Sequence, residues 1–283
     1  MVADNKPLGP NSKAEAPTPD AEGRPRKVRF RIKRCEGPGK PVYWQSFMVE
    51  IEPGANIISC LQKIAENPVT VEGERTTPVS WDAGCLEEVC GSCTMVINGR
   101  VRQSCSALIE RIAPDEGDEV VLEPMSKFPV VRDLWVDRQR MFEALKKINA
   151  WVPIDGTYSL GPGPKESPET QATRYVLSTC MSCGCCLEAC PQYLKEEDPA
   201  EWDSSFIGAA ALSQARLFNL HQTGKQGAKQ RLDALMGPGG VSDCGNAQNC
   251  VKVCPKHIPL TESIAAIGRA VTIRSIARWF TGK

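Results

Sequence analysis

The stretch CMSCGCCLEACP, residues 180–191, constrains this chain more than any other, because five cysteines fall within eleven residues. The whole chain has 14 cysteines among 283 residues, and its first residues include no apolar run typical of an export signal. We therefore expect a reducing compartment, where structural disulfides are rare. Clustered cysteines in that setting indicate metal or redox chemistry.

The composition argues against two classes of protein. The 34 basic and 34 acidic residues give zero formal net charge, so we predict no nucleic-acid partner, which needs a clustered basic surface. No segment offers the about 18 consecutive apolar residues that a membrane span requires. Residues 1–27 are rich in Pro, Ala and charged residues, and we predict a disordered tail there.

Residues 28–131 have the pattern of strands folded around one helix. Apolar residues recur at every second position of KVRFRIK (27–33) and SFMVEI (46–51), which predicts half-buried strands. NIISCLQKIAEN (56–67) has helical spacing instead. An Asn-Gly pair at 98–99 predicts a hairpin. Together these signals predict a small α+β domain.

Residues 132–283 show helical spacing, and no strand is predicted there. The first expected helix, 133–151, has Asp133 as its N-cap. Further helices are expected at 206–220 and 260–280. The apolar stripe of the first helix consists of Leu134, Met141, Leu145 and Ile148. The second domain is therefore predicted to be all-helical.

The stretch CLEEVCGSC, residues 85–93, has the plant-type ferredoxin spacing for a [2Fe–2S] cluster. Gly84 and Gly91 supply the backbone freedom that a tight loop around two irons needs. Zinc is the alternative, although zinc sites favour two Cys-x2-Cys pairs and this group has one. The four predicted ligands are Cys85, Cys90, Cys93 and Cys105.

Residues 180–191 contain the bacterial ferredoxin run C-x2-C-x2-C-x3-C-P, and residues 244–255 repeat it with Ala247 in place of one cysteine. In two-cluster ferredoxins the fourth cysteine of a run binds the other cluster. This rule predicts one complete [4Fe–4S] site. Its ligands would be Cys180, Cys183, Cys186 and Cys254.

The remaining site has only three thiolates, because the side chain of Ala247 has no atom that binds iron. Its ligands would be Cys190, Cys244 and Cys250. The simplest product is a [3Fe–4S] cluster, and a labile [4Fe–4S] cluster with water or hydroxide on one iron is the alternative. The cysteines predicted not to bind iron are Cys35, Cys60 and Cys185.

The order of the three groups, with CLEEVCGSCTMVINGRVRQSC and DCGNAQNCVKVCPKHIPL, resembles the iron–sulfur subunit of succinate dehydrogenase and quinol:fumarate reductase. The resemblance covers about residues 28–280. It implies a plant-type β-grasp ferredoxin domain at 28–131 and an all-α, bacterial-ferredoxin-like domain at 132–283. It also implies an electron path from a flavoprotein subunit with FAD, through the three clusters, to a quinone.

The same resemblance implies a membrane anchor subunit, a cytochrome b, at the cytoplasmic face of the bacterial inner membrane. Many ubiquinone-linked members carry tryptophan shortly after the cysteine matching Cys190 and histidine just after that matching Cys244. This chain has PQYLKEE and Gly245 there. It is therefore more similar to members with a dihaem cytochrome b anchor and menaquinone.

No catalytic residue is predicted, because the chain has two histidines, His221 and His257, and no evident pair of base and nucleophile. Three alternatives stay open at this point. One is a fumarate reductase that runs the reaction in reverse, and one is a structural zinc protein. The third is a free-standing multi-cluster ferredoxin, which would often be acidic, unlike this chain.

Overall fold

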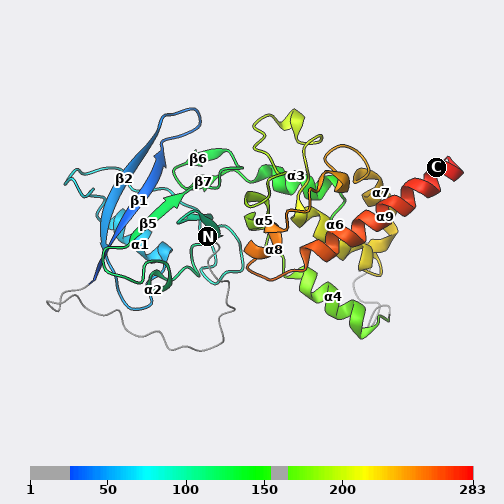
Figure 1. Ribbon diagram of the computed structural model, residues 1–283, viewed down its shortest axis with the longest axis horizontal. Coiled ribbons are helices and arrows are strands. Elements are labelled where there is room, and N and C mark those ends of the chain that lie inside the picture. Colours follow the sequence, from blue (N-terminus) through cyan, green and yellow to red (C-terminus); the bar gives the residue numbers. More distant parts are fainter. Residues whose placement is uncertain (1–25, 154–164, 283) are drawn as a thin grey trace.

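The computed structural model describes residues 26–153 and 165–282, so nearly all of the predicted tail at 1–27 lies outside the described residues. A sheet-rich half and a helical half lie next to each other along the long axis of the molecule (Figure 1). In the part of the chain that the structure describes, no helix has both the length and the hydrophobicity to span a bilayer.

Five strands form a mixed sheet in the order β2-β1-β5-β3-β4. The central strand β1 (Lys27–Cys35) pairs antiparallel with β2 (Val42–Glu50) and parallel with β5 (Glu119–Glu123). On the other side, β5 pairs antiparallel with β3 (Thr94–Ile97), which pairs antiparallel with β4 (Arg100–Gln103). The strands predicted from alternation are therefore present, within one α+β half.

The alternation in β1 places one side of the strand in the core. Val28, Phe30 and Ile32 are buried, whereas Arg29 and Arg31 between them are exposed. The helix α1 (Ile57–Glu66) covers this side of the sheet with an apolar face that includes the fully buried Leu61. The helix predicted at 56–67 is thus confirmed.

The hairpin between β3 and β4 turns at Asn98 and Gly99, which have φ values of +48° and +74°. Both central residues of a type I′ turn need positive φ, which explains the Asn-Gly pair. The side-chain oxygen of Asn98 also accepts a hydrogen bond from the backbone N–H of Val121 (2.7 Å). This turn fixes the register of the hairpin, and Cys93 and Cys105 flank its two strands.

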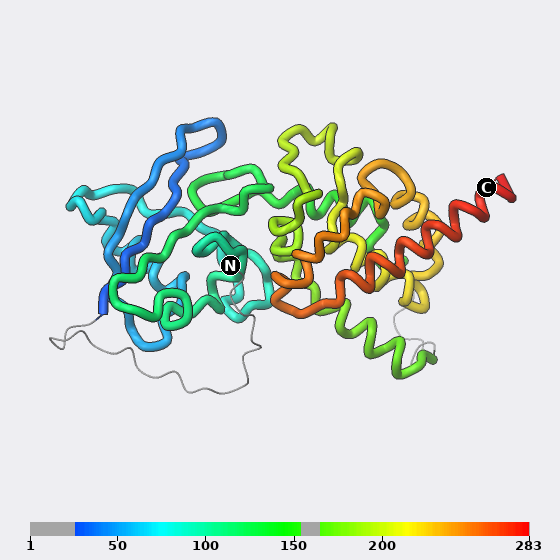
Figure 2. Tube along the Cα trace, in the orientation of Figure 1, coloured from blue at the N-terminus to red at the C-terminus, as the bar shows by residue number. Residues whose placement is uncertain are grey.

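The helical half is built around two long helices, α6 (Ala209–Leu220) and α9 (Leu260–Thr281), which pack against each other through buried residues such as Leu212 and Ile267. Figure 2 shows α9 crossing this half and ending at its far tip. The remaining α-helices are α2 (Ile109–Ile112), α3 (Gln139–Lys147), α4 (Pro168–Ser178), α5 (Cys185–Glu188), α7 (Ala228–Ala234) and α8 (Asn249–Val253). Short 3₁₀ turns lie at Pro199–Glu201, Gly224–Gly227 and Val241–Asp243.

A small antiparallel sheet of β6 (Val130–Arg132) and β7 (Trp135–Val136) connects the two halves. The strand β7 lies within residues 132–283, where no strand was expected, so that expectation was wrong. A strand of two or three residues is too short to show an alternating pattern, which needs about four to eight positions.

Asp133 turns the chain between these two strands and is not a helix N-cap, because α3 begins only at Gln139. Its buried carboxylate accepts hydrogen bonds from Nε of Arg34 (2.9 Å) and from the backbone N–H of Ser80 (2.9 Å). Leu134 packs into the core of the sheet half, and not onto the expected helical stripe. The N-cap prediction was wrong because Asp133 pairs with an arginine 99 residues away, which local spacing cannot reveal.

Candidate metal centres

Cys85 lies in a loop, residues 84–93, whose backbone N–H groups point toward sulfur. Sγ of Cys85 accepts hydrogen bonds from the N–H groups of Glu87 (3.3 Å), Val89 (3.3 Å) and Cys90 (3.2 Å). Convergent N–H groups of this kind stabilise a negative charge on the atom that they surround. The loop therefore favours a thiolate, which is the form of cysteine that binds metal.

Cys90 lies at the exposed side of the same loop and accepts hydrogen bonds from the N–H groups of Cys85 (3.4 Å) and Ser92 (3.5 Å). Burial raises the pKa of Cys90, but these hydrogen bonds outweigh it and bring the pKa to about 6. The backbone reaches this arrangement with Leu86 and Glu88 in the left-handed region. Each such residue costs about 1–2 kcal/mol, so the fold retains strain to aim these N–H groups.

Cys93 ends this loop, and the β3–β4 hairpin brings Cys105 close to it. Burial raises the pKa of Cys93 to about 12, and Cys105 is among the groups that act on it. Asn56, the N-cap of α1, donates a hydrogen bond from Nδ2 to the carbonyl of Cys105 (3.0 Å). Oγ of Ser106 donates to the carboxylate of Glu88 (2.7 Å), which ties the loop to this end of the sheet.

The second predicted set converges at the start of α5. Burial raises the pKa of Cys186 well above its usual value, and the nearby thiols of Cys183, Cys180 and Cys254 raise it further. Burial also raises the pKa of Cys180, with Cys183 and Cys254 again among the causes. Two of these four close thiols are buried and two are half-buried, so all four can be deprotonated only if positive charge lies among them. This set therefore fits a metal group.

The third predicted set lies next to the second. Burial raises the pKa of Cys250, and the nearby Cys190 and Cys244 raise it further. These three cysteines line a cavity that Ala247 and Gly245 also line. The cavity thus has thiols on some sides and a methyl group where the repeated run would place a fourth cysteine.

Within residues 26–153 and 165–282, no group of three or more Cys, His, Asp or Glu side chains is arranged to hold a single metal ion. The fit to clusters rests on other features of the three sets. These are the N–H groups aimed at Cys85 and Cys90, the mutual proximity of the buried thiols, and the cavity beside Ala247. Thiolates with hydrogen-bonded sulfurs are the usual ligands of iron–sulfur clusters.

The first and second sets meet where Gly91 packs against Met181 and Cys183. A Cβ atom on Gly91 would lie 2.7 Å from the carbonyl oxygen of Met181 and 2.8 Å from Cα of Cys183. Gly91 also has a φ of +74°, a conformation that glycine adopts without cost. The lack of a side chain therefore lets the loop of the first set touch the backbone of the second.

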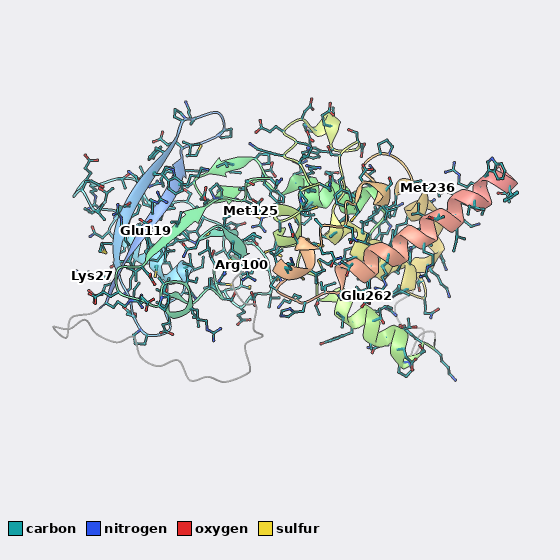
Figure 3. The ribbon with its side chains drawn as sticks, in the orientation of Figure 1. Lys27, Arg100, Glu119, Met125, Met236 and Glu262 are labelled. Carbon is teal, nitrogen blue, oxygen red and sulfur yellow. The ribbon has the colours of Figure 1, made fainter. Side chains whose placement is uncertain are left out.

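Side chains from both halves close this junction. Met125, labelled in Figure 3 between the two halves, is fully buried, and a Cβ atom on Gly184 would lie 3.4 Å from its sulfur. The carboxylate of Glu188 in α5 accepts hydrogen bonds from the backbone N–H groups of Ser126 (2.9 Å) and Lys127 (3.0 Å). The spacing between the first two sets is therefore held by packing and by hydrogen bonds.

Two polar residues at the junction were not predicted from the sequence. Gln103 is buried and donates from Nε2 to Oγ1 of Thr94 (2.6 Å) and to Sγ of Cys185 (3.6 Å). Arg138 donates to the backbone carbonyls of Gly91 and Ser92. The only signal for Gln103 was a polar residue at an inward position of β4, and nothing local marked Arg138.

The cysteines predicted not to bind iron lie in different surroundings. Cys60 is buried on α1, where burial raises the pKa of its thiol to about 12. Sγ of Cys35 donates to the carbonyl of Gly37 (3.1 Å) at the end of β1. Cys185 is fully buried beside Cys183 and Gln103, so it lies between the first two sets and not at their edge.

Comparison with known families divides the chain in the same way. The family described as "2Fe-2S iron-sulfur cluster binding domain" matches residues 29–143. The family described as "4Fe-4S dicluster domain" matches residues 176–258. The two matches fall on the sheet-rich and the helical half, in the order that the cysteine spacing predicts.

Named relatives cover most of the chain. The succinate dehydrogenase iron-sulfur subunit of Bacillus subtilis is 51% identical over 253 residues, which span 89% of this chain and 96% of that protein. The fumarate reductase iron-sulfur subunit of Wolinella succinogenes is 27% identical over 250 residues, with 87% and 97% covered. A chain of the Mycobacterium smegmatis Sdh1 complex in the apo form has a similar fold, with a TM-score of 0.70 at 21% identity over 88% and 97% of the two chains.

Proposed function

Because the chain belongs to the family of iron–sulfur subunits of succinate dehydrogenase and fumarate reductase, we propose that its three cysteine sets hold three clusters in series. The subunit serves electron transfer within that oxidoreductase complex. The proposed ligands are Cys85, Cys90, Cys93 and Cys105 for [2Fe–2S], Cys180, Cys183, Cys186 and Cys254 for [4Fe–4S], and Cys190, Cys244 and Cys250 for [3Fe–4S]. We also propose a β-grasp ferredoxin fold for the sheet half and a bacterial-ferredoxin-like fold for the helical half.

The observation that carries the proposal is the order of contacts between the sets. Iron–sulfur clusters, when bound, carry single electrons. The first set touches the second where Gly91 packs on Cys183, and the second approaches the third where Cys250 acts on the pKa of Cys186. The protein therefore provides a continuous, mostly buried path from the exposed loop at 84–93 to the cavity beside Ala247.

The proposed electron donor is a flavoprotein subunit with FAD that docks on the loop at 84–93. Cys90 is exposed there, and the apolar side chains of Leu86 and Val89 are 50% and 59% exposed. Exposed apolar residues next to a redox site are typical of a protein interface. At the other end, we propose that the third set faces a quinone held by a cytochrome b membrane anchor, at the cytoplasmic face of the membrane.

The proposed quinone is menaquinone, with a dihaem anchor. Gly245 lines the third cavity at the position where many ubiquinone-linked members carry histidine. A Cβ atom on Gly245 would lie 2.5 Å from the side-chain nitrogen of Gln192, so a larger residue would displace that side chain. Because Gln192 is a flexible side chain that could move aside, the support for a quinone site without that histidine is the glycine itself at this position.

Electron paramagnetic resonance of the purified complex during stepwise reduction tests the ligand assignment. The [3Fe–4S] signal should be present when the complex is oxidised and should vanish on reduction. If no oxidised three-iron signal appears, the assignment of the third set is wrong. Reduced-minus-oxidised spectra without b-type haem would contradict the dihaem anchor, and purification without a flavoprotein would contradict the proposed donor.

A further inference from the structure

Arg138 lies between the first two cysteine sets. It precedes α3, and its guanidinium donates hydrogen bonds to the backbone carbonyls of Gly91 and Ser92 in the loop of the first set. The same side chain lines a surface hollow together with Cys90 of the first set and Cys180 of the second. Arg138 thus contacts the point at which the two sets meet.

The charge of Arg138 has no matched partner among residues 26–153 and 165–282. No carboxylate there forms an ion pair with it within 4.0 Å, and its enclosed Nε has no hydrogen-bond partner. Arg34 differs, since its guanidinium pairs with Asp133 at 2.9 Å. Burying a charge without an opposite charge nearby costs free energy of folding. A further negative group beside Arg138 would offset this cost.

The groups whose charge acts on Arg138 are Asp82 and three cysteines, two of which belong to the proposed ligand sets. Burial lowers the pKa of Arg138, and Asp82, Cys183, Cys185 and Cys93 oppose this effect through their negative charge. Of these groups, Cys93 belongs to the first proposed ligand set and Cys183 to the second. When both sets hold their clusters, these sulfurs carry permanent negative charge, so the clusters themselves supply the missing partner.

We infer that Arg138 is the shared positive charge of the [2Fe–2S] and [4Fe–4S] sites, and that it raises the reduction potential of both. The inference rests on the proposed ligand assignment. The step concerned is the arrival of one electron from the preceding carrier, in which no bond forms or breaks and no proton moves. The added electron increases the negative charge beside Arg138, and the fixed guanidinium stabilises that state.

The third site provides an internal reference. Its cysteines, Cys190, Cys244 and Cys250, are not among the charged groups with the largest effect on Arg138. The charge of Arg138 acts more weakly there because the Coulomb energy falls with distance. Replacing Arg138 should therefore shift two of the three potentials and leave the third in place.

The test is a potentiometric titration of the purified complex, followed by electron paramagnetic resonance, for the wild type and Arg138→Gln. The midpoint potentials of [2Fe–2S] and [4Fe–4S] should both shift downward, and that of [3Fe–4S] should be unchanged. Arg138→Lys keeps the charge but not the paired hydrogen bonds, so its potentials should stay near those of the wild type. Equal shifts in the Lys and Gln variants would show a hydrogen-bonding effect and would overturn the inference.

Arg231→Gln is the matched control. Arg231 is a buried arginine that also donates to backbone carbonyls, those of Ile148 (3.0 Å) and Asn149 (2.9 Å), but it is not near the first two sets. This variant should lower stability without moving the two potentials. If both Arg138 variants fail to assemble, Arg138→Met supplies the test, because it removes the charge and keeps a long side chain; unchanged potentials would then refute the inference.

The outcomes also separate this inference from the ligand assignment. A wrong ligand assignment appears in the wild type, as a missing cluster signal. A wrong role for Arg138 appears as three intact signals whose midpoint potentials do not respond to Arg138→Gln.

Discussion

The side-chain nitrogen of Gln103 lies 3.6 Å from Sγ of Cys185, and its side-chain oxygen lies 3.5 Å from Sγ of Cys93. One buried amide thus bridges a proposed ligand of the first cluster and the neighbour of two proposed ligands of the second. Its nitrogen also donates to Thr94 (2.6 Å), which in turn donates to the carbonyl of Gly91 (2.8 Å). The bridge joins the hairpin of the sheet half to the start of α5.

We expect Gln103→Leu to destabilise the junction by about 1–3 kcal/mol, because Thr94 and Cys185 both lose a buried hydrogen-bond partner. The measurement is chemical unfolding of the assembled complex, followed by the visible absorbance of the clusters. A double-mutant cycle that combines Gln103→Leu with Cys185→Ala tests the contact between these two side chains. Directly contacting residues should give a coupling energy of at least about 0.5 kcal/mol.

An exposed glutamine provides the comparison for this cycle. Gln171 lies on the solvent side of α4, so Gln171→Leu should leave the unfolding midpoint unchanged and should not couple to Cys185→Ala. Additive effects of Gln103→Leu and Cys185→Ala would mean that the amide does not bridge the two halves in solution.

Local spacing identified the three cysteine runs, because the cysteines of one run are near in sequence. The same holds for the alternation of β1 and for the Asn-Gly turn of the hairpin, which the structure confirms. The exchange of Cys254 and Cys190 between the second and third sets rests on the rule for two-cluster ferredoxins and stays a prediction. Contacts between distant residues were not predictable from local spacing. Gln103 meets Cys185 across 82 residues, and Arg138 meets Gly91 across 47.

The start of α3 was wrong for a related reason. An aspartate before an apolar helical stripe is the usual signal of an N-cap, but the carboxylate of Asp133 serves Arg34 and the turn between β6 and β7 instead. Cys185 was predicted not to bind iron, since its spacing does not match the ferredoxin run. Its burial between the two sets follows from how the two halves pack, which no local pattern encodes.

We expect Gly91→Ala to disrupt the contact between the first two sets. The new methyl group would lie 2.7 Å from the carbonyl of Met181 and 2.8 Å from Cα of Cys183, and backbone atoms cannot move aside as a flexible side chain can. The variant should assemble with less iron, and with slower electron transfer between the first two clusters. Iron content and single-turnover reduction of the purified complex measure both effects.

Gly99→Ala separates this contact from simple backbone strain. Gly99 has the same φ of +74°, but no atom lies within 4 Å of the position of a Cβ. Both variants should therefore lose about 1–2 kcal/mol from the left-handed backbone. Only Gly91→Ala should also lose iron, and equal iron contents in the two variants would contradict the tight packing at Cys183.

We expect Ala247→Cys to convert the third site to a four-iron cluster. Ala247 lines the same cavity as Cys190, Cys244 and Cys250, so the new thiol would supply the missing fourth ligand. The oxidised three-iron resonance should disappear, the iron content should rise by one atom per complex, and the potential of the site should fall. Ala247→Val adds similar volume without a thiolate and should keep the three-iron signal, and an unchanged signal in Ala247→Cys would mean that the two cysteine runs are misaligned.

Asp133→Ala should lower the free energy of unfolding by about 3–5 kcal/mol, because it leaves the guanidinium of Arg34 buried and unpaired. Both side chains are only 1% exposed, so water cannot replace the lost carboxylate. Chemical unfolding of the complex measures the loss. Glu52→Ala is the control, because it removes an ion pair with Lys63 in which the side chain of Glu52 is 72% exposed. It should lower the free energy of unfolding by less than about 1 kcal/mol. Similar losses for the two variants would show that the pair between Arg34 and Asp133 is hydrated, and that it does not hold β1 to the turn before β7.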